Sequence, residues 1–395
     1  MSNHHLAGPL PYYNAALTER RDAYNFHVRQ HPNYYDEPTR KLLTKELTVG
    51  YYQQKGMLPE TKAELREEYQ DIYSQVLQDV LLRLERAFQA FFRRVKSGEE
   101  PGYPRFQGRN RYDSFTYPQT GGFSLTHDSR VCLSKIGSIK VKMHRPIEGK
   151  MKTATIKHEA GHWDVIFSCE VAQPEPLPVV ESEIGIDLGV THFAALSDGT
   201  FIESPRYSRQ AQKKLEKLQQ ALSRKKRGSH RRKKAVKQVA KAHRKIANQR
   251  RDFHHKHSTQ LVREHQTIVF EHLEMTNLTK RAKPKQDEQT GQYLPNGAAA
   301  KSGLNKSILD AGWGQFQQMC VNKAACAGRT VLFVNPRSTS QVCSNCGTVR
   351  KKSLEERWHS CECGCELDRD TNAAINILRL GRSQQSARVV EAPAF

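Results

Sequence analysis

Five of the chain's nine cysteines lie in one short segment, and this segment constrains the fold more than any other. Cys343-Ser-Asn-Cys346-Gly has the spacing of a zinc knuckle, in which two thiolates lie on a tight turn and the glycine frees the backbone after it. An odd number of cysteines, with most of them clustered, is typical of a zinc protein in a reducing compartment and not of a disulfide framework. Buried apolar cysteines are the alternative, but they do not gather at this density. The segment therefore predicts a structural zinc site.

The second pair of zinc ligands has three candidates, Cys361, Cys363 and Cys365. Trp358 and Gly364 frame the first two, so we predict that Cys361 and Cys363 bind the metal, with Cys365 as the reserve. The gap between them is one residue, which is tighter than the usual two. Four thiolates would hold one Zn²⁺ ion in a closed tetrahedron, and such a site has a structural and not a catalytic role.

An Asp-Arg-Asp step follows the cysteines and opens a predicted helix, LDRDTNAAINIL. On a helix, Asp370 shares a face with Ala374 and Ile377, which are of the kind that pack onto a core. An acid that points into an apolar seam is costly unless a cation or a hydrogen-bond donor meets it. Asp368 lies on another face, where it has the position of an N-terminal cap. From these residues alone, a capping role for both acids is as good an interpretation as a functional role for Asp370.

Two further acids interrupt or end apolar strands. Asp187 follows two isoleucines in a run that predicts a central strand, and Gly189 after it leaves room for a phosphate to approach. A second predicted core strand ends at Glu271, with Glu274 as an alternative acid close by. The other interpretation of Asp187 is an edge-strand residue that faces water. The sequence favours a central strand and hence a functional carboxylate.

Three carboxylates from separate elements could meet at one point of an α/β sheet. Carboxylates held together repel one another, and divalent cations relieve that repulsion. Two Mg²⁺ ions held in this way would activate a water molecule, orient a scissile phosphate and stabilise the leaving oxygen. The sequence is compatible with such a site at Asp187, Glu271 and Asp370.

Basic residues point to a polyanionic partner. Lys and Arg number 63 against 41 Asp and Glu, so the formal net charge is +22, and nucleic acid is the first candidate partner. The segment Arg206–Lys256 is densely basic with a thin apolar seam, and Gly228-Ser229-His230 predicts a turn between two helices. Because phosphate relieves the self-repulsion of such a segment, we favour nucleic-acid contact over a merely solvated face. The candidate contact residues are Lys225, Lys226, Arg227, Arg231, Arg232, Lys233 and Lys234.

The remaining segments outline the domains. Residues 11–98 are predicted to form a helical bundle in which a long helix, Pro59–Gly98, pairs with Tyr12–Gln30 and Arg40–Gln54. Short alternating runs from Ser114 to Val171, separated by glycines, predict a small antiparallel β barrel or sandwich. Residues 174–178 contain three prolines and predict a linker.

Further along the chain, Arg281–Lys301 is predicted to be a mobile loop, Leu304–Ala327 a helix and Thr330–Val334 a strand. No organisation is visible after Gly381. The N-terminus lacks the pattern of a signal peptide, and no apolar run approaches the roughly 20 residues that span a bilayer. We therefore expect a soluble intracellular protein.

The motifs together resemble TnpB, the insertion-sequence nuclease that is related to the type V CRISPR effectors. The resemblance covers roughly Tyr12–Leu380 and rests on GIDLGVTHFAALSDG, IVFEHLEMTNL, LNKSILDAGWGQF, NPRSTSQVCSNCG and CGCELDRDTNAAINIL. It implies a ribonuclease H-like RuvC domain whose catalytic acids, Asp187, Glu271 and Asp370, hold two Mg²⁺ ions. It also implies a guide RNA from the transposon's right end and cleavage of double-stranded DNA next to a short transposon-adjacent motif.

The fold implied by the resemblance is a multidomain one, with α+β and α/β parts. Its parts are a helical recognition domain (11–98), a wedge-like β-barrel (99–178), a RuvC-like nuclease domain (179–335) with a basic helical hairpin (206–265), an inserted zinc ribbon (336–366), a final RuvC helix (367–381) and a tail (382–395). A monomer in the prokaryotic cytoplasm, associated with the nucleoid, is the expected form. The family usually opens with a strand of the KxYKFRLYP kind, which is not found ahead of YYNAALTERRDAY here. We therefore expect the β unit to lack that strand, which would weaken RNA binding or motif reading.

Two other functions compete with a nuclease. An RNA-guided repressor would bind DNA without cutting it. Such a protein would not need the three acids, and this chain has all of them. A transposase that joins strands itself would need a tyrosine nucleophile beside a paired-histidine motif. The histidines of His254-His255-Lys-His257 lie in the basic helix and are interpreted as part of its charge.

Overall fold

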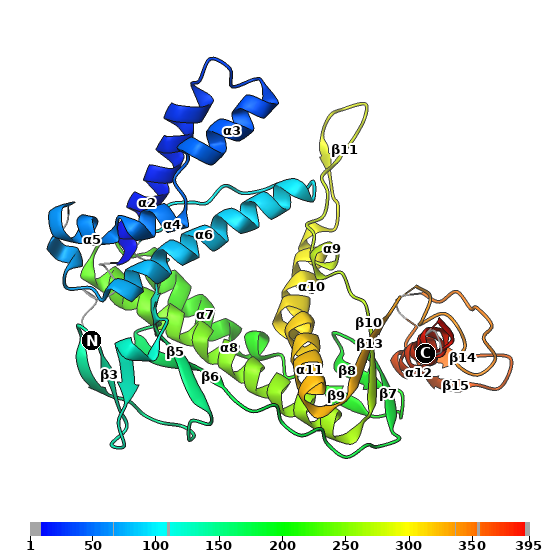
Figure 1. Cartoon of the computed structure of the whole chain (residues 1–395). Helices are drawn as coiled ribbons and strands as arrows, with labels where there is room; N and C mark the ends of the chain where they lie inside the picture. Colours follow the sequence, from blue (N-terminus) through cyan, green and yellow to red (C-terminus); the bar gives the residue numbers. More distant parts are fainter. Residues whose placement is uncertain (1–8, 66, 109–110, 336, 354–355, 392–395) are drawn as a thin grey trace. The chain divides into compact units, whose positions relative to one another are not determined.

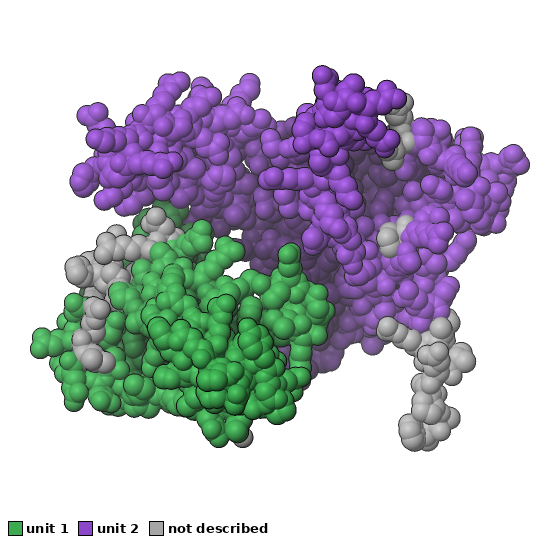
Figure 2. All heavy atoms as spheres, turned by 90° about the horizontal axis from the view of Figure 1, so that it is seen from above, with its two compact units in different colours: residues 1–172 green, residues 173–395 purple. Residues whose placement is uncertain are grey.

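The computed structural model describes residues 9–65, 67–108, 111–335, 337–353 and 356–391. The chain forms two compact units, Met1–Ala172 and Gln173–Phe395, which Figure 2 shows in green and purple. Among the described residues, no helix combines the length and the apolar character that a membrane crossing requires. The signal-peptide prediction rests partly on the first eight residues, which lie outside the described part of the chain.

The first unit begins with a group of helices (Figure 1). Leu17 of the first helix and Leu77, Leu81 and Leu84 of the last are at most 1% exposed and form the centre of its core. The prediction of helices across this region is confirmed. The helical elements are α2 (Pro9–Ala23), η1 (Tyr24–Arg29), α3 (Glu37–Leu47), α4 (Tyr51–Gly56), α5 (Leu58–Glu60), η2 (Thr61–Leu65), η3 (Glu67–Tyr69) and α6 (Ser74–Lys96).

The prediction of one long helix from Pro59 to Gly98 is wrong, because the chain turns between η3 and α6. Lys62 stabilises the turn, since its Nζ donates to the carbonyl of Ile72 at 2.8 Å and to Oγ of Ser74 at 3.1 Å. Tyr69 and Ile72 pack on the helical core from this turn, so the apolar spacing continues although the helix does not. The predicted helix Arg40–Gln54 is likewise two helices, α3 and α4, separated by extended residues.

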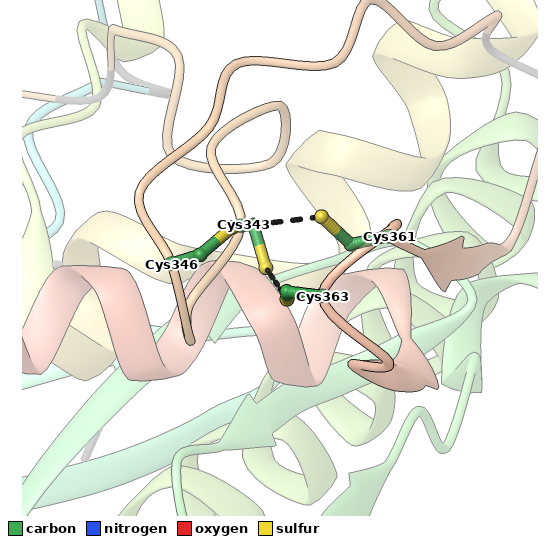
Figure 3. Close-up of side chains that lie close together, drawn as sticks. All are labelled: Cys343, Cys346, Cys361 and Cys363. Atoms are coloured by element: carbon green, nitrogen blue, oxygen red, sulfur yellow. Dashed lines mark hydrogen bonds between the residues drawn. The ribbon is translucent and has the colours of Figure 1, made fainter.

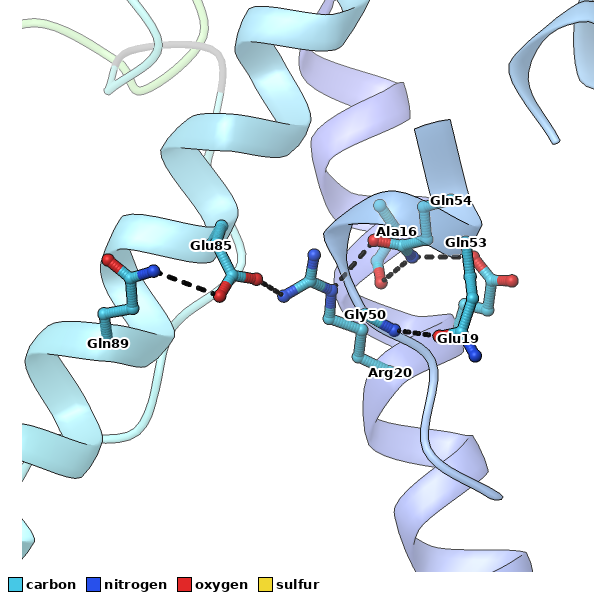
Figure 4. Close-up of polar contacts among 8 residues, drawn as sticks. All are labelled: Ala16, Glu19, Arg20, Gly50, Gln53, Gln54, Glu85 and Gln89. Atoms are coloured by element: carbon cyan, nitrogen blue, oxygen red, sulfur yellow. Dashed lines mark hydrogen bonds and ion pairs between the residues drawn. The ribbon is translucent and has the colours of Figure 1, made fainter. Parts of the chain in front are cut away.

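A buried arginine joins three of these helices (Figure 4). Arg20 of α2 is 7% exposed; its Nε donates to Oε1 of Gln54 in α4 at 2.8 Å, and its Nη1 donates to Oε2 of Glu85 in α6 at 2.7 Å. Gln54 in turn donates to Oε2 of Glu19 at 2.7 Å. A buried charge is tolerated only when it is paired and hydrogen-bonded, so these contacts fix the three helices against one another.

The rest of the first unit is built of antiparallel strands. They form two three-stranded sheets, in the orders β1-β5-β6 and β2-β3-β4. Phe115, Tyr117, Phe123, Val131 and Ile156 are buried in one core between these strands. The antiparallel β unit is therefore confirmed, and its closure into a barrel stays a prediction. The strands are β1 (Ser114–Tyr117), β2 (Phe123–Leu125), β3 (Arg130–Leu133), β4 (Gly137–Lys140), β5 (Lys150–Glu159) and β6 (His162–Glu170).

The second unit is organised by a mixed five-stranded sheet with the order β13-β10-β7-β8-β9. Strand β7 is central; it pairs in parallel with β10 and antiparallel with β8, and β10 pairs in parallel with β13. The central position of the strand that carries Asp187 is as predicted. The strands are β7 (Glu183–Leu188), β8 (His192–Leu196), β9 (Phe201–Glu203), β10 (Thr267–Glu271) and β13 (Thr330–Val334).

Helices cover both faces of this sheet (Figure 1). On one face, Ile186 and Phe270 of the strands pack against Leu261 of α8 and Phe316 of α11. On the other face, Val269 packs against Ile377 of α12. The helices of this unit are α7 (Tyr207–Ser223), α8 (His230–Glu264), α9 (Met275–Leu278), α10 (Ala298–Ala311), α11 (Trp313–Ala327) and α12 (Arg369–Glu391).

Three sequence predictions in this unit need correction. The helix predicted over Leu304–Ala327 is two helices, because Gly312 between them adopts a left-handed conformation with φ of 67°. The loop predicted over Arg281–Lys301 contains a short hairpin of β11 (Lys285–Gln286) and β12 (Tyr293–Leu294) and the start of α10. The tail after Gly381 is largely helical, because α12 continues to Glu391 and Arg382 anchors it with a 2.6 Å ion pair to Glu183. Residues 392–395 of that tail lie outside the described part.

Helix α12 and strand β7 approach each other closely at Gly185. A Cβ at this position would lie 2.2 Å from the carbonyl oxygen of Ala374, which is far inside van der Waals contact with backbone. Replacing Gly185 with alanine should therefore push α12 away from the sheet and lower the free energy of unfolding by about 2 kcal/mol or more. Chemical denaturation of the purified chain measures this change.

Gly303 offers a matched control, because it lies within α10 and a Cβ there would meet nothing within 4 Å. Gly303→Ala should leave the free energy of unfolding unchanged or raise it by up to about 1 kcal/mol through helix propensity. Equal stabilities for the two variants would contradict the close approach of α12 to β7.

Candidate active site and metal centre

The alternation of side chains along two neighbouring strands places Asp187 and Glu271 on the same face of the sheet. Ile186 and Leu188 belong to the core on the α8 and α11 face, so Asp187 between them points to the α12 face. Glu271 is two residues after Val269, which packs against α12. Phe270 is the register partner of Ile186, and the next residues along the two strands are Glu271 and Asp187. Adjacent strands lie about 4.8 Å apart, so both acids sit at the same level of the sheet.

Asp370 reaches this level because α12 runs antiparallel to β7 and β10. The helix ends near the starts of the strands, where Gln385 donates to Oγ1 of Thr267 at 3.4 Å. The first turn of α12 therefore lies at the carboxyl ends of the strands. A Cβ at Gly189, just after β7, would lie 4.0 Å from Oδ2 of Asp370. The structure thus brings the three predicted acids to one end of the sheet.

Asp368 has a different role from Asp370. Its Oδ1 accepts hydrogen bonds from the backbone amides of Asp370 at 2.8 Å and Thr371 at 3.3 Å. These contacts satisfy donors that every helix leaves free in its first turn. The predicted N-cap is confirmed, and Asp370 is left as the acid of this helix that faces the sheet.

The pKa values of the three acids reflect their shared environment. Burial raises the pKa of Asp187 well above its usual range, and the negative charges of Glu271 and Asp370 raise it further. Burial also raises the pKa values of Glu271 and Asp370. The hydrogen bond from Thr339 lowers the pKa of Glu271 and offsets part of this rise. The positive charges of Arg357 and Arg369 do the same for Asp370. Without a cation, these carboxylates are therefore held in an environment that disfavours their charge.

The surroundings of Glu271 distinguish it from the alternative acid, Glu274. Glu271 is 9% exposed; its Oε1 accepts a 2.5 Å hydrogen bond from Oγ1 of Thr339, and its backbone carbonyl accepts one from Gln317 at 3.2 Å. Glu274 is exposed, and its carboxylate accepts a hydrogen bond from Asn277 in the adjacent short helix α9. The geometry favours Glu271 as the acid of the site.

The donor set of the acid cluster fits divalent cations of the Mg²⁺ type, which bind carboxylate oxygens. Carboxyl groups from three elements have raised pKa values here, so the site disfavours their negative charge unless a cation neutralises it. Among the described residues, however, the groups of ligand atoms that all lie within 4.8 Å of one another are made of cysteine and histidine and do not include these acids. This spacing does not exclude two ions, because carboxylates that bind different members of an ion pair need not touch one another.

The raised pKa values predict how stability depends on pH. A carboxyl group with a higher pKa in the folded chain stabilises it below the ordinary pKa, and this contribution is lost as pH rises through the raised pKa. The metal-free chain should therefore lose stability from this cluster between mildly acidic and neutral pH. At pH 7.5, Mg²⁺ at one hundred times its dissociation constant should restore about 2.7 kcal/mol for one site. Thermal melts with and without Mg²⁺ at several pH values measure the effect.

Asp187→Asn is the companion variant for this measurement. It removes one of the repelling charges, so the melting temperature without metal should rise at neutral pH, and added Mg²⁺ should have less effect. A melting temperature that falls in this variant, or no response of the native chain to Mg²⁺, would contradict the electrostatic account of the cluster.

Four cysteines form a second centre, shown in Figure 3. The sulfurs of Cys343, Cys346, Cys361 and Cys363 all lie within 4.8 Å of one another. Cys343 is 3.7 Å from Cys363 and Cys346 is 3.6 Å from Cys361, measured between Sγ atoms. A tetrahedron with Zn–S bonds of about 2.3 Å has sulfurs about 3.8 Å apart, so the four thiols fit one zinc ion.

Local contacts favour the thiolate form that zinc requires at Cys346. Sγ of Cys346 lies 3.3 Å from Oγ1 of Thr348, and this hydrogen bond is the largest of the contacts that lower the pKa of Cys346 to about 6. At Cys361 the backbone hydrogen bond of Cys363 lowers the pKa, but hydrogen bonds to the neighbouring cysteine sulfurs outweigh it, and the pKa of Cys361 is instead raised to about 12. Two short strands, β14 (Trp358–Ser360) and β15 (Glu366–Asp368), pair next to the cluster and lead into α12. The segment has the elements of a zinc ribbon, and its ligand assignment stays a prediction.

Cys365, the reserve ligand, lies in a different group. Its sulfur is within 4.8 Å of Cys343 and of a ring nitrogen of His359, which is fully buried. Cys343 belongs to both groups, so Cys365 lies close to one ligand of the four-cysteine group and could approach a metal ion bound there. The four-cysteine group has the complete ligand set of a closed site, and we retain it as the prediction.

The predicted nucleic-acid residues lie at the turn between α7 and α8. Ser229 caps α8, since its Oγ accepts from the amide of Arg232 at 3.2 Å. Arg232 itself donates to the carbonyls of Leu222 at 3.0 Å and Lys225 at 3.2 Å, so it closes the turn. Two of the seven candidates, Lys225 and Arg232, are thus half-buried parts of the turn. The five exposed candidates are Lys226, Arg227, Arg231, Lys233 and Lys234.

Sequence reasoning missed four residues that hold the two centres in place: Thr339, Asn372, Asn376 and Gln317. All four are polar and buried, with exposures of 0 to 8%. A signal was present for the two asparagines, because an asparagine pair four residues apart lies on one face of the predicted helix. Asparagine is a poor helix former, so two of them on a buried face indicate hydrogen bonds to another segment.

Comparison with known proteins agrees with this arrangement. Residues 166–282 match the OrfB_IS605 family, which is described as "Probable transposase", and residues 313–377 match the Cas12f1-like TNB domain. At the level of fold, the chain is similar to a Cas12f1 chain in the cryo-EM structure of the Cas12f1-sgRNA-target DNA complex. The TM-score is 0.52 at 13% identity, over 95% of this chain and 81% of that one.

Two relatives align over most of the chain. One is the "Putative RNA-guided DNA endonuclease InsQ" of Escherichia coli strain K12, which is 36% identical over 79% of this chain and 76% of its own length. The other is a "Putative RNA-guided DNA endonuclease" of Streptomyces pristinaespiralis, 33% identical over 87% of this chain and 80% of its own length. On this evidence and on its own motifs, the chain belongs to the TnpB family of insertion-sequence proteins.

Proposed function

We propose that this chain is an RNA-guided DNA endonuclease of a transposon, which hydrolyses a phosphodiester bond next to a short transposon-adjacent motif. The observation that carries the proposal is the meeting of Asp187, Glu271 and Asp370 at one end of the sheet. Relatives over most of the chain are named RNA-guided DNA endonucleases, which supports the same function.

The fold of the second unit supports a ribonuclease H-like RuvC domain. Three antiparallel strands, β7 to β9, are followed by two parallel ones, β10 and β13, and helices cover both faces. Asp187 and Glu271 lie at the carboxyl ends of two neighbouring parallel strands, and Asp370 lies at the start of the helix that covers them. Together they form a site at this end of the sheet. Ligands bind open α/β sheets at the carboxyl ends of such strands.

The three acids would hold two Mg²⁺ ions, which when bound activate a water molecule, orient the scissile phosphate and stabilise the leaving oxygen. Burial raises the pKa of Asp187, and repulsion from Glu271 and Asp370 raises it further, so a cation bound here would relieve that repulsion. Gly189 leaves the space beside Asp370 open, and a phosphate can approach there. Arg357 and Arg369 lower the pKa of Asp370, and their positive charge favours the same approach.

The remaining domain assignments are part of the proposal. Residues 11–98 and 99–178 would hold the guide RNA and read the motif, 179–335 and 367–381 would form the nuclease domain, and 336–366 the zinc ribbon. The zinc would have a structural role. A monomer in the cytoplasm, close to the nucleoid, is the proposed working form.

The basic hairpin of α7 and α8 would contact the phosphate backbone. Changing Lys226, Arg227, Arg231, Lys233 and Lys234 together to glutamine should weaken binding of guide RNA or target DNA. Each phosphate that the hairpin no longer neutralises makes the slope of log affinity against log salt concentration shallower by about 0.7 to 0.9. Filter binding at several salt concentrations measures the slope.

A charge-preserving variant is the control for the hairpin. Changing the three lysines, Lys226, Lys233 and Lys234, to arginine keeps every positive charge and should leave the salt slope unchanged. A glutamine variant with the native slope would mean that the hairpin does not contact phosphate.

One experiment tests the function as a whole. RNA that copurifies with the full chain is sequenced, and its guide segment is used to design a matching DNA target with randomised flanks. Cleavage of that target with Mg²⁺, and none with EDTA or with an unmatched target, is the expected result. Guided binding without cleavage would instead favour a repressor, and cleavage without RNA would contradict guidance.

A further inference from the structure

A short loop ahead of the zinc ribbon contacts the acid cluster. After β13 the chain continues to Thr339, which is 5% exposed and donates the 2.5 Å hydrogen bond to Glu271. The same loop reaches the first zinc knuckle at Cys343, four residues later. One loop therefore contacts both the acid site and the metal centre.

Helix α12 holds this loop through a row of polar side chains. Nδ2 of Asn376 donates to the carbonyls of Thr339 at 2.9 Å and Val342 at 2.7 Å. Nδ2 of Asn372 also donates to the carbonyl of Val342 at 2.7 Å, and its Oδ1 accepts from the amide of Ser344 at 2.9 Å. Backbone groups that are buried in this way need such partners, so the row replaces the hydrogen bonds of a regular strand.

The row continues one turn further along the helix. Nη2 of Arg379 donates to the carbonyl of Ser344 at 2.8 Å. Asn372, Asn376 and Arg379 are spaced at four and three residues, so they share one face of α12. Asp370 is on the same helix, two residues before Asn372. The helix that carries one acid thus fixes the loop that contacts another.

We propose that Thr339 is a positioning residue for Glu271, and that Asn376 fixes Thr339 so that the acid cluster keeps one arrangement. This proposal rests on the proposed function, because it assumes that the cluster binds divalent cations. In this role, Thr339 acts through the carboxylate of Glu271.

The hydroxyl of Thr339 restricts the carboxylate of Glu271. It occupies one lone pair of Oε1, so the carboxylate cannot rotate freely and the second oxygen keeps its direction. Partners of metal-binding carboxylates typically contribute 10- to 100-fold to metal affinity.

Two variants of Thr339 separate the hydroxyl from the shape of the side chain. Valine is nearly isosteric and lacks the hydroxyl, whereas serine retains it. The full chain, freed of nucleic acid by nuclease treatment, is titrated with Mn²⁺ in a calorimeter, and its zinc content is measured by mass spectrometry. Asp187→Ala is the reference variant, because it gives the Mn²⁺ affinity of a chain whose acid site is disrupted.

Thr339→Val should weaken Mn²⁺ binding at the acid site by about tenfold or more, while Thr339→Ser stays close to the native chain. Zinc content should remain at one ion in both variants.

A double variant tests the role of Asn376. Asn376→Leu alone should weaken Mn²⁺ binding in the same direction as Thr339→Val. If Asn376 acts through Thr339, the double variant should bind Mn²⁺ no more weakly than Thr339→Val alone. Additive losses would overturn this part of the proposal.

The outcomes distinguish this proposal from the proposed function. Native affinity in Thr339→Val, together with weak binding in Asp187→Ala, would overturn the positioning role alone. If Thr339→Val and Thr339→Ser weaken Mn²⁺ binding equally, the effect comes from the shape of the side chain and not from its hydroxyl. This result would also overturn the positioning role. Equal Mn²⁺ binding by the native chain and Asp187→Ala would overturn the acid site itself and, with it, both proposals.

Discussion

Replacing Asp187 with alanine is expected to lower the rate of guided DNA cleavage by about 10³-fold or more. Asp187 lies on the central strand, next to the strand that ends in Glu271, and the negative charges of Glu271 and Asp370 both act on it. A metal site of this kind contributes several kcal/mol of transition-state stabilisation, and each 1.4 kcal/mol is about tenfold in rate. Single-turnover cleavage with a programmed guide and saturating Mg²⁺ measures the loss.

Binding of RNA and DNA should be nearly unchanged in Asp187→Ala, because this side chain takes part in cleavage and not in nucleic-acid binding. Glu274→Ala is the matched control: Glu274 is a nearby acid that is exposed and bonded to Asn277, and its removal should leave cleavage at the native rate. If Asp187→Ala loses binding together with cleavage, Asp187 is structural. If Glu274→Ala is the inactive variant, the assignment of Glu271 is wrong.

The parts of the site that the sequence predicts are those with a local signal. A single carboxylate in an otherwise apolar strand, as in Ile-Gly-Ile-Asp187, is costly to bury without a purpose, and that cost is visible without coordinates. The same holds for Asp370 on the apolar face of α12 and for the cysteine pairs. In each case the side chain and its unsuitable surroundings are neighbours in sequence, so the conflict can be seen in the sequence itself.

The parts that could not be predicted depend on contacts between distant segments. Thr339 lies in an irregular loop, and its importance comes from Glu271, which is 68 residues away along the chain. The loop has no periodicity, so nothing in the residues around Thr339 shows that its hydroxyl meets Glu271. Asn372 and Asn376 gave a weak signal, but their partners in that loop could be known only from the fold.

The errors in the fold have a similar origin. Apolar spacing predicts which residues face a core but not whether the backbone between them stays helical. Tyr69 and Ile72 face the same core as α6 although a turn separates them from it. Gly312 ends one helix and begins the next with the apolar pattern uninterrupted, because its left-handed backbone costs a glycine little.

Replacing Cys346 with serine is expected to remove zinc from the chain and to loosen the ribbon. Four sulfurs at the spacing of a zinc tetrahedron make a closed site, and a serine oxygen is a poor substitute for a thiolate ligand. Structural zinc contributes about 10 to 16 kcal/mol in small zinc-binding peptides, so the short strands β14 and β15 should not remain folded without it. Zinc content should fall from one ion to none, and limited proteolysis should cut within 337–368.

Cys365→Ser decides between the two possible ligand sets. Cys365 approaches Cys343 and His359 but is absent from the four-cysteine group, so its serine variant should keep one zinc ion and the native protease resistance. Zinc loss in Cys365→Ser, with zinc retained in Cys361→Ser, would instead make Cys365 the fourth ligand. Because Cys343 belongs to both groups, its own replacement cannot discriminate between them. The ribbon also continues into the Thr339 loop and α12, so a chain that has lost zinc should bind Mn²⁺ more weakly at the acid site as well.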